Sequence, residues 1–192
     1  MDYIVVRIDR ELANPFVIKH HYTQAFGKAS IILGLYKIDH PELQGVITFG
    51  QCSGRLVAQS ICEGGNEKNV MEFLRMVVLD DCDCPRTYFM SKAVTILRQK
   101  YPAVKCLVTY ADQTEGHTGT VYRANSWKHV GQTGAKYHYT LDGTRYNKRI
   151  IWDHAVRLGI KEKEYADTRG YVKVPELPKL KFVKTLRRVK LK

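Results

Sequence analysis

The stretch KCLVTYADQTEGHTGTVYRANSW, residues 105–127, decides the fold. It begins with an apolar, β-branched run from Cys106 to Tyr110 that predicts a buried strand. The chain becomes polar at Asp112, crosses the turn-forming residues 113–116 and then predicts a short helix at residues 117–126. A strand that ends in a carboxylate ahead of a helix is a usual way for an open α/β sheet to build a site. Asp112 is therefore predicted either as a catalytic carboxylate or as a cap of the next helix.

Other elements follow from the periodicity of the apolar residues. Strands are predicted at residues 3–8, 30–38, 43–52, 70–79, 128–133, 136–141 and 144–146. Helices are predicted from residue 10 to about residue 20, within 54–63, at 87–101 and at 150–159. We expect Pro15 to kink or restart the first helix, and Trp152 and Val156 to face inward from the last.

These elements predict an α/β (α+β) fold with a mixed, largely antiparallel central sheet flanked by helices. The predicted catalytic domain covers residues 1–168, and a basic, extended tail covers residues 169–192. No apolar run reaches the roughly 18 residues needed to cross a bilayer. The start of the chain lacks a basic leader, so we expect a cytoplasmic protein that does not enter a membrane.

The net charge of +12 points to a polyanionic partner. Residues 171–192 hold eight basic residues against the single acid Glu176. Pro175 and Pro178 favour an extended arm that lies along nucleic-acid phosphates, although a solubilising tail or a contact with anionic lipid would share this composition. The residues predicted to make the nucleic-acid contacts are Lys179, Lys181, Lys184, Arg187 and Arg188.

Several polar residues interrupt otherwise apolar segments. His21 and Tyr22 belong to a His-His-Tyr cluster after the first helix, where a capping role is the alternative to a functional one. Arg75 lies in the most apolar strand, so it either pairs with an acid or binds an anionic or carbonyl group. Ser91 and Lys92 lie near the start of a helix, which favours an anion such as a cofactor phosphate. The spacing of Cys82 and Cys84 is too tight for a usual zinc site.

The order of elements resembles the GNAT acyltransferase fold, carried by residues 73–101 and by the ending TVYRANSWKHVGQT, residues 120–133. GNAT enzymes bind the coenzyme A pyrophosphate with a glycine-bearing loop, and the corresponding CPRTYFMSK, residues 84–92, has no glycine. We therefore do not predict a coenzyme A thioester as the donor, and the identity of the group donor stays open.

A narrower resemblance covers residues 20 to about 133. The segments HHYT, EFLRMVVLDD, YAD and GHTGTVY, with the ending W-x-x-x-G-x-T, are together similar to the phage Mom family. This resemblance implies a phage-encoded enzyme in a bacterial host that transfers a carbamoylmethyl group from a small-molecule donor to the exocyclic amine of adenine in double-stranded DNA. The modification would protect phage DNA from host restriction enzymes.

The resemblance also implies site residues. The family's functional positions fall on His21, Tyr22, Arg75, Asp112 and Tyr122. Iron is associated with the family, and His21, Tyr22 and Asp112 are suitable ligands for it. Asp112 or His21 would accept the amine proton, and Tyr122 would protonate a leaving group or hold a donor carbonyl. Arg75 would stabilise charge on the donor or bind its carboxylate. Extruding the base from duplex DNA calls for an aromatic stacking surface, which a tyrosine would supply.

Two other functions fit the same sequence. A conventional GNAT N-acetyltransferase acting on a protein or small amine would bind coenzyme A tightly. A non-catalytic nucleic-acid binder would keep all of its activity when Asp112 is replaced by alanine. The oligomeric state is not predicted by any of these features.

Overall fold

The computed structural model describes residues 2–192, which form two sheets and the helices that cover them. The larger sheet has the strand order β1-β2-β3-β4-β5-β10-β6 and the smaller one the order β8-β7-β9. The strands are β1 (Tyr3–Arg7), β2 (Ala29–Lys37), β3 (Leu43–Gln51), β4 (Val70–Val78), β5 (Cys106–Ala111), β6 (Lys128–Gln132), β7 (Lys136–Leu141), β8 (Thr144–Tyr146), β9 (Val172–Glu176) and β10 (Leu180–Thr185). The pairs from β1 to β4 are antiparallel and β4 pairs with β5 in parallel, which confirms the predicted fold class.

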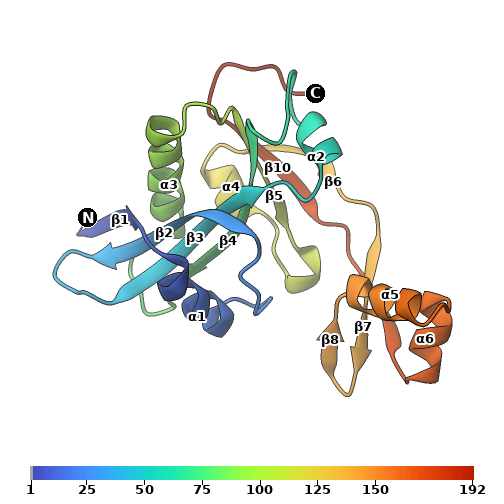
Figure 1. Cartoon of the computed structure of the whole chain (residues 1–192). Helices are drawn as coiled ribbons and strands as arrows, with labels where there is room; N and C mark the ends of the chain where they lie inside the picture. The colour runs from blue at the N-terminus through green and yellow to red at the C-terminus, as the bar shows by residue number, and fades with distance from the viewer. Residues whose placement is uncertain (1) are drawn as a thin grey trace. The chain divides into compact units, whose positions relative to one another are not determined.

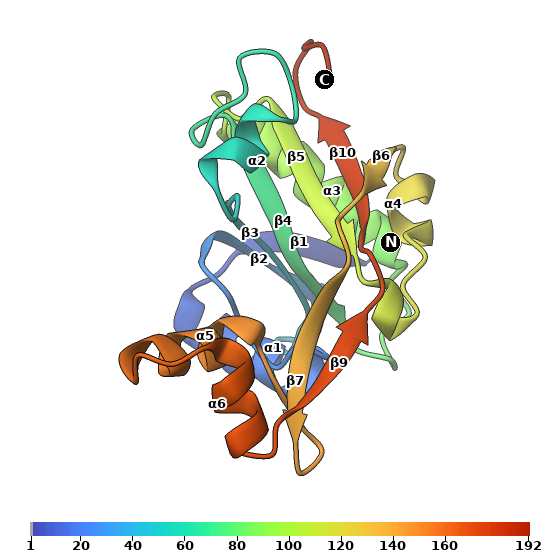
Figure 2. The same cartoon turned by 90° about the vertical axis from the view of Figure 1, so that its right-hand side faces the viewer.

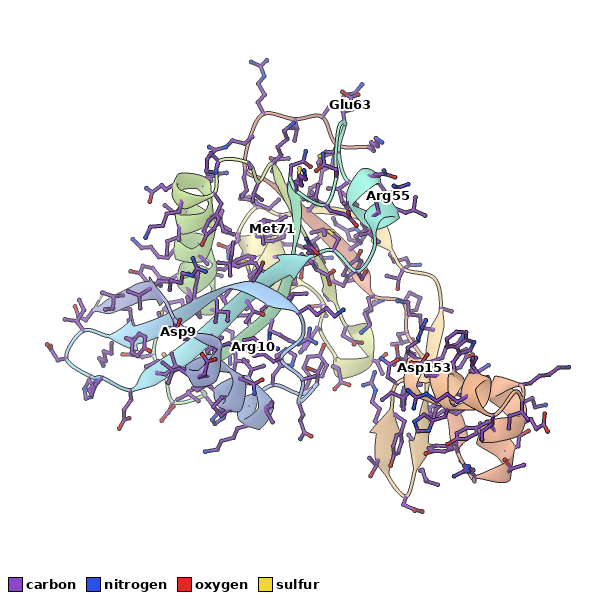
Figure 3. The ribbon with its side chains drawn as sticks, in the orientation of Figure 1. Asp9, Arg10, Arg55, Glu63, Met71 and Asp153 are labelled. Atoms are coloured by element: carbon purple, nitrogen blue, oxygen red, sulfur yellow. The ribbon has the colours of Figure 1, made fainter. Side chains whose placement is uncertain are left out.

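The helices are α1 (Arg10–His20), α2 (Arg55–Gln59), α3 (Arg86–Lys100), η1 (Gln113–Glu115), α4 (Thr120–Ala124), α5 (Lys148–Arg157) and α6 (Glu162–Thr168). Asp9 and Arg10, labelled in Figure 3, mark the start of α1. The helix continues through Pro15, so a restart of the helix at that residue is wrong. No helix among residues 2–192 is both long and apolar enough to span a membrane.

The chain divides into two compact units. The first contains residues 1–110, 119–130 and 181–192, and the second contains residues 111–118 and 131–180.

In the first unit, helices cover both faces of the sheet (Figure 1). Ala13 and Val17 of α1 pack with Val46 of β3 on one face. Neighbouring strand residues point to opposite faces, and a Cβ at Gly45 would lie 3.1 Å from the ring of Phe89 of α3. Gly45 therefore lets α3 lie close to the other face.

The second unit packs α5 and α6 against β7. Its core contains Tyr139, Ile151 and Tyr165, which are all at most 4% exposed. The prediction that Trp152 and Val156 face inward is wrong, because they are 40% and 53% exposed. Residues 150–152 are all large and apolar, so their pattern alone left the buried face of the helix uncertain by one position. The sequence reading also missed α6.

The predicted tail is not a separate arm. Residues 172–176 form β9 in the smaller sheet, and residues 180–185 form β10 between β5 and β6 (Figure 2). Phe182 and Val183 are fully or almost fully buried. The prolines do favour extended backbone, but here the alternation of lysines with apolar residues fits a strand that packs into a core. The predicted boundary at residue 168 therefore does not separate the compact units.

The predicted helix at 117–126 is shorter and later than expected. Gly116 and Gly119 have left-handed φ angles of 74° and 79°, so the helical path is broken until Thr120. Only η1 and α4 form in this region.

Candidate functional site

Strands β4 and β5 separate partway along their length. They pair from Val70 with Cys106 to Glu72 with Val108, and β4 then bulges. Thr48 of β3 pairs with Arg75 and Phe49 with Phe73, so Leu74 is the extra residue. A bulge bends its strand and commonly occurs beside functional sites. Beyond this point the backbone of β4 needs partners other than the backbone of β5.

Thr109 supplies a partner for the backbone where the pairing ends. Its Oγ1 donates to the carbonyl oxygen of Phe73 at 3.1 Å, and it also bonds the hydroxyl of Tyr122 at 3.3 Å. Both threonine contacts are buried or partly buried. Tyr122, on α4, is thereby fixed beside the point where the two strands diverge.

Aromatic rings surround Tyr122. Its ring centroid lies 6.0 Å from that of Phe73, 5.5 Å from that of Trp127 and 5.3 Å from that of Phe182. Burial raises the pKa of Tyr122, and the bond to Thr109 opposes this only in part. Tyr122 therefore keeps its proton at neutral pH.

Trp127 is a residue whose role the sequence reading missed. It is 4% exposed, and its indole N–H has no hydrogen-bond partner within residues 2–192. A buried donor without a partner costs free energy, which a ligand acceptor would recover. In the sequence Trp127 was only part of a motif, and no sequence signal shows that its N–H stays unpaired.

His21, Tyr22 and Arg75 are connected through one loop. His21 ends α1, its Nδ1 accepts from the backbone N–H of Thr23 at 3.1 Å, and its ring stacks on Tyr22 at 4.4 Å. Arg75 donates from Nε to the carbonyl oxygen of Ala25 at 3.1 Å. The structure therefore links the His-His-Tyr loop to β4, where Arg75 lies just beyond the bulge.

Asp112 belongs to the second unit and is 1% exposed. Its Oδ1 accepts from the N–H of Thr114 at 3.2 Å, and its Oδ2 lies 2.5 Å from the ammonium of Lys179. Burial alone would raise the pKa of Asp112, but Lys179, the Thr114 N–H and the charge of Arg145 together lower it. The carboxylate caps η1, which agrees with the capping role that the sequence predicted as one of two alternatives. It is also a buried, ionised group.

A second group of charges in this unit was not found from the sequence. Arg145 contacts Glu115 at 3.0 Å and Glu176 at 2.5 Å, and Glu176 also bonds His138 at 3.1 Å. These residues come from distant parts of the chain, so only the fold brings them together.

Ser91 and Lys92 are exposed on α3. The helix begins at Arg86, so they lie beyond its first turn, where the unpaired N–H groups are found. The ammonium of Lys92 lies over the ring of Tyr88 at 5.3 Å. The helix-terminus argument for an anion therefore does not apply to them, and their role as cofactor contacts stays a prediction.

Most of the lysines and arginines predicted to bind DNA bond to the protein itself. Lys181 reaches Ser60 Oγ at 3.3 Å, Lys184 donates to the carbonyl oxygen of Asn125 at 2.7 Å, and Arg187 to that of Arg98 at 2.6 Å. Burial, with the nearby Arg98 charge, lowers the pKa of Lys184. Arg188 is exposed.

The iron site is not supported by the donor groups. No three His, Cys, Asp or Glu side chains in the described part of the chain gather so that they would hold a metal ion. Asp112 is already ion-paired with Lys179, and His21 belongs to the other compact unit. Iron stays a prediction of the sequence resemblance.

The chain was compared with known proteins. The model of the Mom protein family matches residues 2–189. The methylcarbamoylase mom of Escherichia phage Mu is 28% identical over 152 residues, which cover 77% of this chain and 60% of that protein. The chain thus spans about three fifths of the length of this curated relative.

Solved acetyltransferase structures share the fold. Spermidine/spermine N-acetyltransferase SpeG from Vibrio cholerae has a TM-score of 0.55 at 6% identity, covering 96% of this chain and 93% of that one. Arabidopsis thaliana NAA60 in complex with a bisubstrate analogue has a TM-score of 0.55 at 10% identity, covering 95% and 97%. At these identities the likeness establishes a GNAT-like fold alone. The family match over nearly the whole chain identifies this protein as a member of the Mom protein family.

Proposed function

We propose that this protein is a DNA-modifying transferase that adds a carbamoylmethyl group to the exocyclic amine of adenine, protecting phage DNA from host restriction enzymes. The observation that carries the proposal is the family match over residues 2–189. The relative from phage Mu is named a methylcarbamoylase, which agrees with transfer of a small group that contains an amide.

The separation of β4 and β5 supports a site for the group donor. The Trp127 indole N–H has no partner within residues 2–192, and the centroid of its ring lies 5.5 Å from that of Tyr122, whose hydroxyl bonds Thr109. A carbonyl oxygen on the donor would accept from the indole N–H, or from Tyr122 once its hydroxyl turns away from Thr109, and placed donors stabilise charge that develops on such an oxygen.

Arg75 of β4 pairs with Thr48 and Phe73 pairs with Phe49, so the Arg75 side chain lies on the other face of the sheet from the rings packed on Phe73. Its positive charge would bind a carboxylate or another anionic part of a donor that passes between β4 and β5.

In the transfer step, the adenine nitrogen forms a bond to the methylene carbon of the donor, and the leaving group departs with the electrons of the broken bond. The nitrogen becomes cationic and must lose one proton. That proton is more acidic than a carboxylic acid, so a carboxylate with a lowered pKa suffices as its acceptor. We assign Asp112 this part, with the proton reaching the buried carboxylate through water or after Lys179 moves aside.

Double-stranded DNA is the proposed macromolecular substrate. The net charge of +12 favours a polyanion, and binding through phosphates would weaken as salt rises. The target base must leave the stack before its amine is accessible. Tyr22 stacks on His21 and is 43% exposed, so its ring offers a surface on which the extruded base would stack. The loop that carries it is bonded to Arg75 through the carbonyl oxygen of Ala25.

The test is mass spectrometry of nucleosides from plasmid DNA recovered from cells that express the protein. We expect a deoxyadenosine in which a carbamoylmethyl group replaces one hydrogen, and we expect Tyr122→Phe to reduce it strongly while the protein stays folded. Unmodified nucleosides from cells with abundant folded wild-type protein would reject the proposal.

A conventional N-acetyltransferase is the alternative, because the fold is shared with acetyltransferases. It predicts tight binding of acetyl-coenzyme A and acetylation of a protein or small amine, with DNA left unchanged. Calorimetric titration with acetyl-coenzyme A separates this function from the proposed one.

A further inference from the structure

We propose that Lys179 is a positioning residue that holds Asp112 and its loop in place, and that it is not a contact for DNA phosphates. The inference rests on the proposed function, in which Asp112 takes part in the transfer. It reverses the expectation drawn from the basic composition of residues 171–192.

The ammonium of Lys179 is committed to Asp112. The two groups are 2.5 Å apart, and their side chains are 27% and 1% exposed. An ion pair with one member this deeply buried differs from a surface pair, because removing the cation leaves a carboxylate that water does not solvate. Lys179 thus offsets the cost of burying Asp112.

The backbone of Lys179 is also held on both sides. Its N–H donates to Thr133 Oγ1 at 3.0 Å, and its carbonyl oxygen accepts from the N–H of Thr133 at 2.9 Å. The ring of the preceding Pro178 restricts the same backbone. The backbone that carries the lysine side chain is therefore fixed in position. A side chain that only contacts phosphates at the surface would not require this.

The segment before Lys179 runs along the loop that carries Asp112. The N–H of Leu177 donates to Thr114 Oγ1 at 3.0 Å, and the side-chain amide of Gln113 donates to the carbonyl oxygen of Pro178. Together with the ion pair, these bonds join residues 177–179 to residues 112–114. Lys179, 67 positions away in sequence, thus determines where the Asp112 carboxylate lies.

The experiment compares Lys179→Gln and Lys179→Arg with Lys163→Gln, which removes one charge from an exposed position on α6. DNA affinity is measured over a range of salt concentrations, and modification is measured by nucleoside mass spectrometry. We expect Lys179→Gln to lower the rate of DNA modification about a hundredfold, because misplacement of a reacting group has an effect of this size. We expect its DNA affinity to depend on salt as that of Lys163→Gln does. Lys179→Arg keeps the charge and should restore much of the modification.

The opposite result would identify a phosphate contact. If Lys179→Gln reduces the slope of log affinity against log salt by about 0.9 more than Lys163→Gln does, and if excess DNA restores full modification, the positioning role is wrong. An equal loss of modification in Lys179→Arg and Lys179→Gln would also contradict the positioning role.

Thermal unfolding of the full chain keeps the test independent of the proposed function. Lys179→Gln should melt about 10 °C lower, because it leaves a buried charge unpaired. Adding Asp112→Asn should recover part of that loss, whereas additive losses would show that the two side chains are not coupled. If the wild-type protein leaves adenine unmodified but this coupling is found, the proposed function is wrong and the ion pair between Lys179 and Asp112 is still confirmed.

Discussion

The hydroxyl of Thr109 donates a hydrogen bond to the carbonyl oxygen of Phe73 at 3.1 Å, just beyond the last paired residues of β4 and β5. A side chain there replaces the backbone partner that a continuing ladder would have supplied. The same hydroxyl bonds Tyr122 at 3.3 Å, so the end of strand pairing and the placement of a candidate catalytic group depend on one residue.

Replacing Thr109 by valine keeps the shape of the side chain and removes this hydroxyl. We expect the free energy of unfolding to fall by about 1–3 kcal/mol, because the Phe73 carbonyl is left buried without this partner. Denaturant titration measures the change. The control is Thr95→Val, an exposed α3 position whose hydroxyl bonds Ser91, with an expected change within about 0.5 kcal/mol.

Gly119 should not tolerate a side chain. Its φ is 79°, and an added Cβ would lie 2.4 Å from the Phe182 ring. Gly116 has a similar φ of 74° with nothing within 4 Å. Gly116→Ala should cost about 1 kcal/mol for the backbone alone, and Gly119→Ala should cost a further 1–3 kcal/mol or so for overpacking. Equal losses in denaturant titrations would contradict the close packing of Phe182 on Gly119.

The acid stability of the protein should depend on Asp112. Its pKa is lowered from an ordinary value of 3.8, so its ionised form stabilises the fold above that pH, and the stabilisation disappears as the pH falls through the lowered pKa. Asp112→Asn cannot titrate. The wild-type protein should therefore lose more of its free energy of unfolding than the variant between about pH 5 and about pH 2. The same pH dependence in both proteins would contradict this prediction.

Truncation after Gly170 should abolish folding. It removes β9 and β10, and with them the buried residues Phe182 and Val183. Far-UV circular dichroism and the yield of soluble protein measure the result. A folded truncation product that only binds DNA less tightly would instead support the separate arm predicted from the sequence.

An exposed charge near the end of the chain should be removable without this damage. The variant Arg188→Gln changes an exposed residue just after Leu186 and Arg187. We expect a melting temperature close to that of the wild type and a weaker salt dependence of DNA binding. An unchanged salt dependence would exclude Arg188 as a phosphate contact.

Local patterns were sufficient for much of the sheet. The apolar run at residues 106–110 became β5, and the run at 70–79 became β4 with Arg75 inside it. Periodicity works for such segments because a strand buried on both faces must be apolar throughout. It failed for α5, where residues 150–152 fit more than one orientation, and for residues 180–185, where basic composition hid a strand.

By itself the sequence determined the fold class, the resemblance to the Mom family and the residues around which a site was sought, because these depend on residue types and spacing along the chain. Tertiary structure alone decided that Lys179 pairs with Asp112, that Thr109 supports both Phe73 and Tyr122, and that Trp127 keeps a buried, unpaired N–H. Such relationships join residues far apart in sequence. A lysine in a basic segment has the same local pattern whether it faces DNA or a buried carboxylate, and only the folded chain fixes which of these it contacts.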